Sequence, residues 1–346
     1  MNNKTKISGC IVLVSIFTGC ACAPSRTTRG RAAKAPSVPS AKASAVVVPA
    51  RYTGTSTSFR RVLKDVTYCT VDEVDLKMDI YQPNAQDMTQ PAPVVLFLHG
   101  GGWRLSDKSD VLRTVDIDQL NHRGFLVASI NYRLAPRYKF PAMIVDAKCA
   151  VRYLKAHAEI YHINPDKISA CGISSGGHLA ALLGLAGVEA GWDIGAYPSV
   201  SSQVQAVVDM CGPTDLPPIA DAPGNIQGLP AIFGTTNIHD PILTNASPVV
   251  YVTSNAPPFL IFHGDKDTML PLWQSQELQR KLQAAGATAE LVVVRDVGHL
   301  FKPIGPSITR KCCESFHLIL WFLHQYYIPP EISHKTIDFL VQTLTP

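Results

Sequence analysis

The chain contains no Cys-x-x-Cys pair, and none of its nine cysteines stands at a zinc-ligand spacing from a histidine. These absences argue against metal binding, and neither a metal nor a cofactor is expected. Cys171 and Cys211 close neighbouring predicted strands and are therefore a candidate disulfide pair. Buried free thiols that act as small hydrophobic side chains are the alternative.

Acidic residues are missing from residues 21–50, which also show no sustained hydrophobic period. Such a segment cannot bury enough apolar surface to offset the entropy of ordering, so we expect a flexible basic tether. Residues 1–50 carry seven basic residues, and the formal net charge of +4 becomes 4 − 7 = −3 for residues 51–346. A nucleic-acid partner is therefore not expected for the body of the chain.

The apolar run at residues 7–17 is too short to span a bilayer comfortably. It follows two lysines and precedes small residues, a pattern that predicts a signal peptide over residues 1–20. The sequence FTGC at residues 17–20 resembles the lipobox of bacterial lipoproteins, although Phe17 replaces the usual leucine. We expect an exported protein, either lipidated at Cys20 and held to a membrane by that anchor alone, or plainly secreted after cleavage nearby.

The rest of the chain has the composition of a globular protein, since 46% of all residues are hydrophobic and 17% charged. Strands are expected at residues 62–70, 74–81, 94–98, 125–130, 168–171, 205–210, 259–262 and 290–294, the first two as an antiparallel pair. Helices are expected at residues 109–123, from Pro141 through Ala158, and at 178–188, 272–285 and 308–327. This alternation predicts an α/β fold with a mostly parallel sheet that helices cover on both faces.

Residues 212–258 interrupt the alternation with several prolines, scattered glycines and no clear period. A connection this long inside a compact domain is usually functional, so we expect a lid over a cleft, with a surface loop as the alternative. The expected organisation is a signal peptide (1–20), a tether (21–50) and one domain (51–346) that carries the lid.

The predicted strand at residues 168–171 runs into the sequence GISSG at residues 172–176, and a helix pattern follows at once. This matches the GxSxG nucleophile elbow, in which a strained strand-to-helix turn projects the serine hydroxyl into a cleft. Gly172 and Gly176 remove two Cβ atoms that would collide with the turn. Ser174 is therefore the candidate nucleophile, although the five letters alone match too many glycine-rich turns to show chemistry.

Other predicted strands also end in residues that suit catalysis, and ligands of open parallel sheets bind beyond the carboxyl ends of the strands. A serine needs a histidine to accept its proton and a carboxylate to orient that imidazole. His299, which follows the last predicted strand, is the expected base, and Asp267 is the expected acid. Asp265 and Asp296 are rivals for the acid, although both are more typical of turn residues.

Backbone N–H groups of a glycine-rich loop can approach a tetrahedral oxyanion closely. We assign this role to the amides of Gly101, Gly102 and Ser175. The aromatic residues Trp103, Tyr132, Phe233 and Tyr251 are candidates for the substrate pocket, with ordinary packing as the alternative. His178 could share a helix face with Ser174 but is expected to be a packing or capping residue, and His99 and His263 are expected to hydrogen-bond backbone behind their turns.

Together these motifs resemble those of α/β-hydrolase carboxylesterases of the hormone-sensitive-lipase-like and BD-FAE (acetyl-esterase/feruloyl-esterase-like) group. The matching segments are HGGGW (99–103), NYRLAP (131–136), GISSGGH (172–178), CGPTD (211–215), HGDKD (263–267) and GH (298–299), within about residues 60–325. The resemblance implies the α/β-hydrolase fold, Asp267 as the acid, and a serine carboxylesterase that hydrolyses small acyl esters through an acyl-enzyme. Acetyl or feruloyl esters of polysaccharides are one substrate class that it implies.

The chain departs from the hormone-sensitive-lipase relatives at two points. Ser175 replaces their common alanine, and their long N-terminal cap is missing, which favours the BD-FAE side. Two other functions stay open: an amide hydrolase on the same fold, similar to formamidases or dipeptidyl peptidases, and a non-catalytic binding protein on a hydrolase scaffold.

Overall fold

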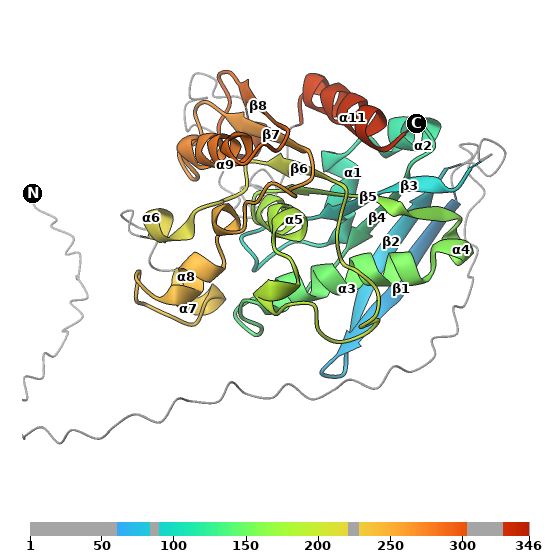
Figure 1. The fold of residues 1–346 in the computed structure, drawn as a ribbon, viewed down its shortest axis with the longest axis horizontal. Helices are drawn as coiled ribbons and strands as arrows, with labels where there is room; N and C mark the ends of the chain where they lie inside the picture. The colour runs from blue at the N-terminus through green and yellow to red at the C-terminus, as the bar shows by residue number, and fades with distance from the viewer. Residues whose placement is uncertain (1–60, 84–89, 221–227, 303–327, 346) are drawn as a thin grey trace, which may run out of the picture. The chain divides into compact units, whose positions relative to one another are not determined.

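The computed structural model describes residues 61–83, 90–220, 228–302 and 328–345 (Figure 1). The predicted signal peptide, the tether, Cys20 and the predicted helix at residues 308–327 lie outside these ranges. Within them, no helix is both long enough and apolar enough to cross a membrane.

One eight-stranded sheet forms the centre of the described domain, with the strand order β1-β2-β4-β3-β5-β6-β7-β8. The strands are β1 (Arg61–Val71), β2 (Val74–Gln82), β3 (Ala92–Leu98), β4 (Leu126–Ile130), β5 (Ile163–Ile173), β6 (Ala206–Met210), β7 (Phe259–Gly264) and β8 (Ala289–Val294). β1 pairs antiparallel with β2, and β2 pairs antiparallel with β4. The pairs from β4 through β3 to β8 are all parallel, which confirms the predicted sheet.

Helices cover both faces of the sheet, and the side chains of β3 show how the two faces are divided. Val94, Leu96 and Leu98 point into a core shared with α3, α5 and α9. Val95 and Phe97 point into a second core with α1, α2 and α11. Because successive strand residues face opposite sides, the continuous apolar run of β3 is buried on both. These helices are α1 (Val111–Thr114), α2 (Ile117–His122), α3 (Ala142–Ala156), α5 (Ser175–Leu185), α9 (Trp273–Ala284) and α11 (Pro330–Leu344).

Several predicted boundaries are wrong. The single helix expected at residues 109–123 is a 3₁₀ turn, η1 (Lys108–Asp110), followed by α1 and α2, because Asp116 caps a new helix by accepting a hydrogen bond from the Gln119 N–H. The helix after Pro141 ends at Ala156, and a separate turn, α4 (Ala158–Tyr161), follows. β5 begins at Ile163, so the Asn-Pro-Asp segment at residues 164–166 lies inside the strand. The last helix of the described residues, α11, is not among the predicted helices.

Cys171 and Cys211, the candidate disulfide pair, are not bonded to each other; both are free and buried thiols, which confirms the alternative. Cys171 pairs across the sheet with Val208, so Cys211 lies three residues further along, about 10 Å, which exceeds the reach of a disulfide. The structure instead joins Cys69 on β1 to Cys149 on α3, whose Cα atoms are 6.6 Å apart. A long-range bond therefore ties the antiparallel edge of the sheet to the helix that covers it.

The segment at residues 212–258 lacks a sustained period because its described part consists of four short helices. These are α6 (Leu216–Ala220), α7 (Leu229–Ile232), α8 (Pro241–Asn245) and η4 (Pro248–Val250). A short 3₁₀ turn, η2 (Val188–Ala190), and another, η5 (His299–Phe301), complete the described elements. The segment enters from the carboxyl end of β6 and returns to β7, beside the elbow helix α5 (Figure 1).

Candidate active site

Ser174 occupies a strained turn between β5 and α5. Its backbone has φ 55° and ψ −121°, a conformation that side-chain-bearing residues rarely adopt. A Cβ atom on Gly172 would overlap the carbonyl oxygen of Gly176, and one on Gly176 would overlap that of Leu98. Both glycines are therefore required for the turn to close. The Ser174 N–H donates to the Met210 carbonyl at 2.8 Å, which ties the turn to β6.

The three predicted catalytic side chains meet at the carboxyl ends of β5, β7 and β8. The Ser174 Oγ lies 2.9 Å from the His299 Nε2. The His299 Nδ1 lies 2.6 Å from the Asp267 Oδ2. The second carboxylate oxygen of Asp267 accepts the N–H groups of Met269 and Leu270, each at 2.9 Å, so the carboxylate is held in place from its other side.

Two loops are held together so that Asp267 can reach His299. A Cβ atom on Gly264 would contact the Val297 carbonyl, so a glycine at the end of β7 permits the close approach of the loop after β8. The Lys266 N–H donates to the same carbonyl at 3.0 Å. The predicted rival Asp265 accepts from the Asp296 N–H at 2.7 Å, and Asp296 itself is an exposed turn residue with φ 58°. Both rivals therefore build the turns that position the triad.

The electrostatics of the pair favour an ionised carboxylate next to a basic ring. Burial tends to raise the pKa of Asp267, but the hydrogen bond and charge of His299 and the Leu270 N–H outweigh it and hold that pKa below its usual value. Burial tends to lower the pKa of His299, yet the Cys211 sulfur and the Asp267 carboxylate outweigh it and raise that pKa above its usual value. The Asp267 side chain has no exposed surface, so little water screens the interaction.

The predicted oxyanion donors lie where β3 ends against the start of α5. We call residues 99–103 the oxyanion loop. Gly101 has φ 105°, and a Cβ atom there would overlap the Leu105 carbonyl, so this position requires glycine. The Gly101 carbonyl accepts the N–H groups of Arg104 and Leu105, both at 3.1 Å. Because α5 begins against the carbonyls of Leu98 and His99, the amides of Gly102 and Ser175 come from adjacent segments.

The remaining predicted histidines support the site from behind, as expected. The His178 Nε2 donates to the Ala246 carbonyl at 2.7 Å, and this ring is fully buried. The His99 Nδ1 lies 2.7 Å from the Gly100 carbonyl. The His263 Nε2 lies 2.8 Å from the Leu270 carbonyl and 3.5 Å from the Asp267 Oδ2, so it also braces the acid.

The predicted pocket aromatics are mostly packed. Tyr132 is buried, its ring stacks on His99 with centroids 4.3 Å apart, and its hydroxyl donates to the His99 carbonyl at 2.8 Å. It therefore supports the oxyanion loop. The centroid of the Trp103 ring lies 5.0 Å from that of His178 and 5.9 Å from that of Phe233, which belongs to the 212–258 segment; both contacts are edge-on. Tyr251 packs against Trp192 at 5.6 Å. Substrate contact by Trp103 or Tyr132 stays a prediction.

Sequence reasoning missed two residues near the site. Cys211 directly follows β6, which lies between β5 and β7 in the sheet, and its position just beyond a carboxyl end could have signalled it. Gln274 on α9 accepts the N–H groups of Thr214 and Asp215, at 2.6 and 2.8 Å, and donates to the Asp215 carbonyl at 2.9 Å. It anchors the start of the 212–258 segment, and nothing in its local sequence pattern predicts this. Among the described residues, Cys211, Asp267 and His299 form a group whose ligand atoms could hold a metal ion.

The parallel sheet and the elbow at the end of its fifth strand define an α/β-hydrolase. The model of the BD-FAE family matches residues 78–282, more than half of the chain, so the protein belongs to the BD-FAE family.

Known proteins with similar sequences and structures are esterases by name. The esterase LipC of Mycobacterium tuberculosis (strain ATCC 25618 / H37Rv) is 29% identical over 245 residues, which cover 69% of this chain and 60% of LipC. The chain spans 47% and 54% of two further relatives from that organism, so about half the length of such relatives is matched.

Two solved structures resemble the whole described domain. One is a truncated carbohydrate esterase from gut microbiota, with a TM-score of 0.67 and 26% identity over 85% of this chain and 100% of that one. The other is a thermophilic esterase from Thermogutta terrifontis with butyrate bound, with a TM-score of 0.64 and 25% identity over 84% of this chain and 96% of that one.

Proposed function

We propose that the protein is a serine carboxylesterase that hydrolyses small acyl esters through an acyl-enzyme at Ser174. The observation that carries this proposal is the continuous hydrogen-bonded path from the Ser174 Oγ to the His299 Nε2 and from the His299 Nδ1 to the Asp267 carboxylate. Membership of the BD-FAE family and the names of similar esterases support the same reaction.

The proposed acylation step gives each proton a path along these hydrogen bonds. The Ser174 Oγ attacks the ester carbonyl carbon while its proton passes to the His299 Nε2, and the Nδ1–H keeps its hydrogen bond to Asp267. The oxyanion that forms is stabilised by N–H donors of the oxyanion loop and Ser175. When the tetrahedral intermediate collapses, the C–O bond to the alcohol breaks and the Nε2 proton goes to the leaving oxygen.

Deacylation follows the same path with water in place of Ser174. His299, neutral again, takes a proton from water as the water oxygen attacks the acyl carbon, and then returns that proton to the Ser174 Oγ as the acid leaves. No cofactor is required by either step.

The test of this function is Ser174→Ala. Hydrolysis of p-nitrophenyl acetate should fall by about 10⁴-fold or more, because the nucleophile is gone while binding groups remain. The folded state should be unchanged by circular dichroism, because the alanine fits the space that the serine leaves. A variant that hydrolyses this ester as fast as the parent protein would remove Ser174 from the mechanism.

Acetyl or feruloyl esters attached to polysaccharides are the substrate class that we propose. The similarity to a carbohydrate esterase supports the carbohydrate part of this class, and the butyrate bound to another similar structure supports a small acyl group. A panel of p-nitrophenyl esters from two to twelve carbons, together with acetylated xylan and methyl ferulate, tests it. Activity confined to the long-chain esters would reject this substrate class.

We also propose that the protein is exported, with lipidation at Cys20, and that residues 212–258 act as a lid. The basic start, the short apolar run and the FTGC sequence support export. The bond between Cys69 and Cys149 also supports it, because disulfides persist in oxidising compartments. The contact of Phe233 with Trp103 supports the lid, since it brings the segment against the oxyanion loop.

A further inference from the structure

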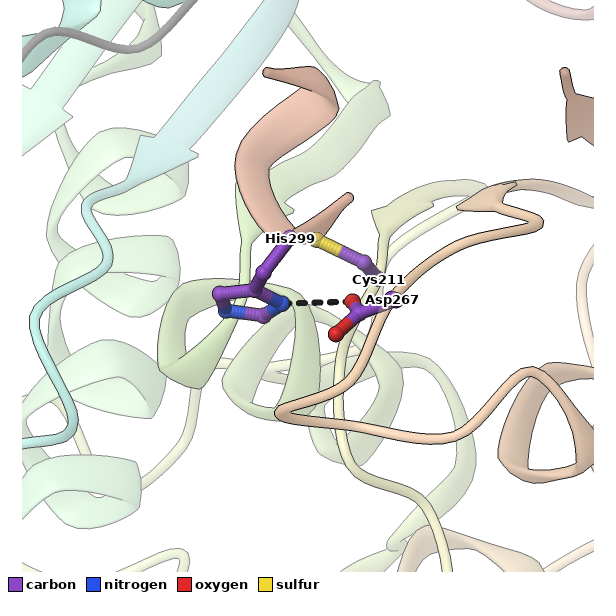
Figure 2. A group of neighbouring side chains, drawn as sticks. All are labelled: Cys211, Asp267 and His299. Carbon is purple, nitrogen blue, oxygen red and sulfur yellow. Dashed lines mark hydrogen bonds and ion pairs between the residues drawn. The ribbon is translucent and has the colours of Figure 1, made fainter. Parts of the chain in front are cut away.

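Among the described residues, Cys211 lies beside the triad and has no part in the esterase mechanism given above. It follows β6 with φ 48°, and its N–H donates to the Phe262 carbonyl on β7 at 2.8 Å, so its backbone is fixed between two strands. Its Sγ, an Asp267 carboxylate oxygen and a His299 ring nitrogen all lie within 4.8 Å of one another. Figure 2 shows the sulfur next to the hydrogen-bonded His299–Asp267 pair.

These three groups are the ligand types that zinc and similar cations prefer. Zn²⁺ binds thiolate at about 2.3 Å and imidazole or carboxylate at about 2.0–2.2 Å, usually in a tetrahedron. Thiolate in particular selects soft cations over Mg²⁺ or Ca²⁺. The three ligands come from the segments that follow the adjacent strands β6, β7 and β8, and their ligand atoms already lie within 4.8 Å of one another.

Burial strengthens this arrangement. Cys211 is 1% exposed, the Asp267 side chain has no exposed surface, and the His299 side chain is 11% exposed. Because the three side chains are buried, water only weakly screens the attraction between a cation and these ligands, and a divalent cation balances the charges of one thiolate and one carboxylate.

We propose that Cys211, Asp267 and His299 form a binding site for a thiophilic divalent cation of the Zn²⁺ type, and that the bound cation switches the triad off. The ring nitrogen on the Asp267 side is Nδ1, so a cation shared with Asp267 takes that nitrogen. The ring proton then moves from Nδ1 to Nε2, and the Cys211 thiol releases its proton to solvent. An Nε2 that carries a proton has no lone pair for the Ser174 hydroxyl, so general-base catalysis stops.

The binding test uses Cd²⁺ on the full chain, because thiolate–Cd²⁺ charge-transfer absorbance in the near ultraviolet reports the sulfur directly, whereas Zn²⁺ is silent. Any other thiol that Cd²⁺ reaches would add to the absorbance, so the measured quantity is the difference between the parent protein and Cys211→Ala. Cys171→Ala is the matched control, because Cys171 is also a free buried thiol and lies on β5 away from the group. The difference band should be present against Cys211→Ala and absent between Cys171→Ala and the parent.

A second pair of variants tests the other two ligands without depending on Cys211. His299→Gln and Asp267→Asn should each raise the Cd²⁺ concentration at half-saturation of this band by at least about tenfold, since even changes outside the ligand set weaken metal sites by about 10–100-fold. Saturation of the band at the parent's concentration in both variants would overturn the site.

The inhibition test rests on the proposed esterase function. Zn²⁺ should inhibit hydrolysis of p-nitrophenyl acetate by the parent and by Cys171→Ala, and EDTA should restore it. The half-inhibitory concentration should rise at least about tenfold in Cys211→Ala, with each variant normalised to its own metal-free rate. Equal inhibition of both cysteine variants would refute the switch. If the parent has no esterase activity, the proposed function fails, and the Cd²⁺ band still decides the metal site separately.

Discussion

Two groups of buried charged side chains lie at opposite ends of the elbow helix α5 and behave differently. At the N-terminal end of α5, Asp267 accepts the Nδ1–H of His299, and the Nε2 of the same ring faces the Ser174 hydroxyl. At the far end, Lys148 and Arg152 of α3 share one carboxylate, that of Asp193, at 2.7 and 3.0 Å. Both groups remove charge from water, but only the first presents an unused lone pair to a reacting group.

The second group is satisfied from within the protein. The three Nζ–H groups of Lys148 are taken by Asp193, the Ala186 carbonyl at 2.8 Å and the Ser202 Oγ at 3.1 Å. Arg152 also donates to the carbonyls of Ile194 and Ala196. A closed set of this kind fixes the loop between α5 and β6, whereas an open set at a strand end supports chemistry. In this protein, the group of buried charges with a catalytic arrangement is therefore the one in which a ring nitrogen can still accept a proton from a reacting group.

The largest effect in this comparison is expected from Asp267→Asn. The asparagine favours the wrong tautomer of His299, so kcat for p-nitrophenyl acetate should fall by about 10⁴-fold while the fold is kept. Asp265→Asn is the matched control on the same loop and should change kcat by less than about tenfold, because Asp265 accepts the Asp296 N–H and pairs with the Lys266 ammonium but has no hydrogen bond to Ser174 or His299. Comparable losses of kcat in the two variants would contradict the assignment of Asp267 as the acid of the triad.

At the far end of α5, Asp193→Ala should reduce stability and leave the chemistry intact. The substitution leaves the buried Lys148 and Arg152 cations without their carboxylate partner. The free energy of unfolding should drop by about 2–4 kcal/mol, somewhat less than for a fully buried pair because the Asp193 side chain is 15% exposed. Urea unfolding followed by fluorescence measures this, and kcat should be unchanged where the variant is folded. Glu189→Gln, an exposed carboxylate in the same loop, should stay within about 0.5 kcal/mol of the parent.

The smallest effect concerns pH. His299 must be neutral to accept the Ser174 proton, so kcat/KM should fall as the pH drops through the pKa of the ring. Since Cys211 and Asp267 raise that pKa, the low-pH limb should lie above the ordinary histidine value of about 6.5. In Cys211→Ala the limb should move to lower pH, and in Cys171→Ala it should not. Profiles measured with a chelator present decide this, and a parent limb near pH 5 would contradict it.

Much of the fold could be predicted because local patterns specify it. Each of the eight strands was anticipated, since apolar runs bounded by glycine, proline or polar turns mark buried strands. The predicted element boundaries are wrong where a side chain caps a new helix, as Asp116 does, or where a sequence typical of a turn lies within a strand, as at residues 164–166. The helix α11 went unrecognised because its amphipathic pattern follows another helical pattern without a strand between them.

The residues of the candidate site also fall into those that the sequence predicts and those that it does not. Ser174, Asp267 and His299 could be found because each lies just beyond a predicted strand, and parallel strands bring their carboxyl ends to one edge. The role of Tyr132 as a support for the oxyanion loop could not be found, since stacking on His99 depends on how two segments pack. The hydrogen bonds by which Gln274 anchors the 212–258 segment and the disulfide between Cys69 and Cys149 could not be predicted from the sequence for the same reason.

The sequence by itself determined the order of the eight strands, the elbow with its two obligatory glycines, and the triad residues just beyond the strand ends. Those features depend on backbone sterics and on periods of a few residues, which neighbouring side chains express directly. Only the tertiary structure decided that Cys211 lies against His299 rather than against Cys171. That outcome depends on the register of β5 with β6 and on the left-handed turn at Cys211, which are set by contacts between residues far apart in the chain.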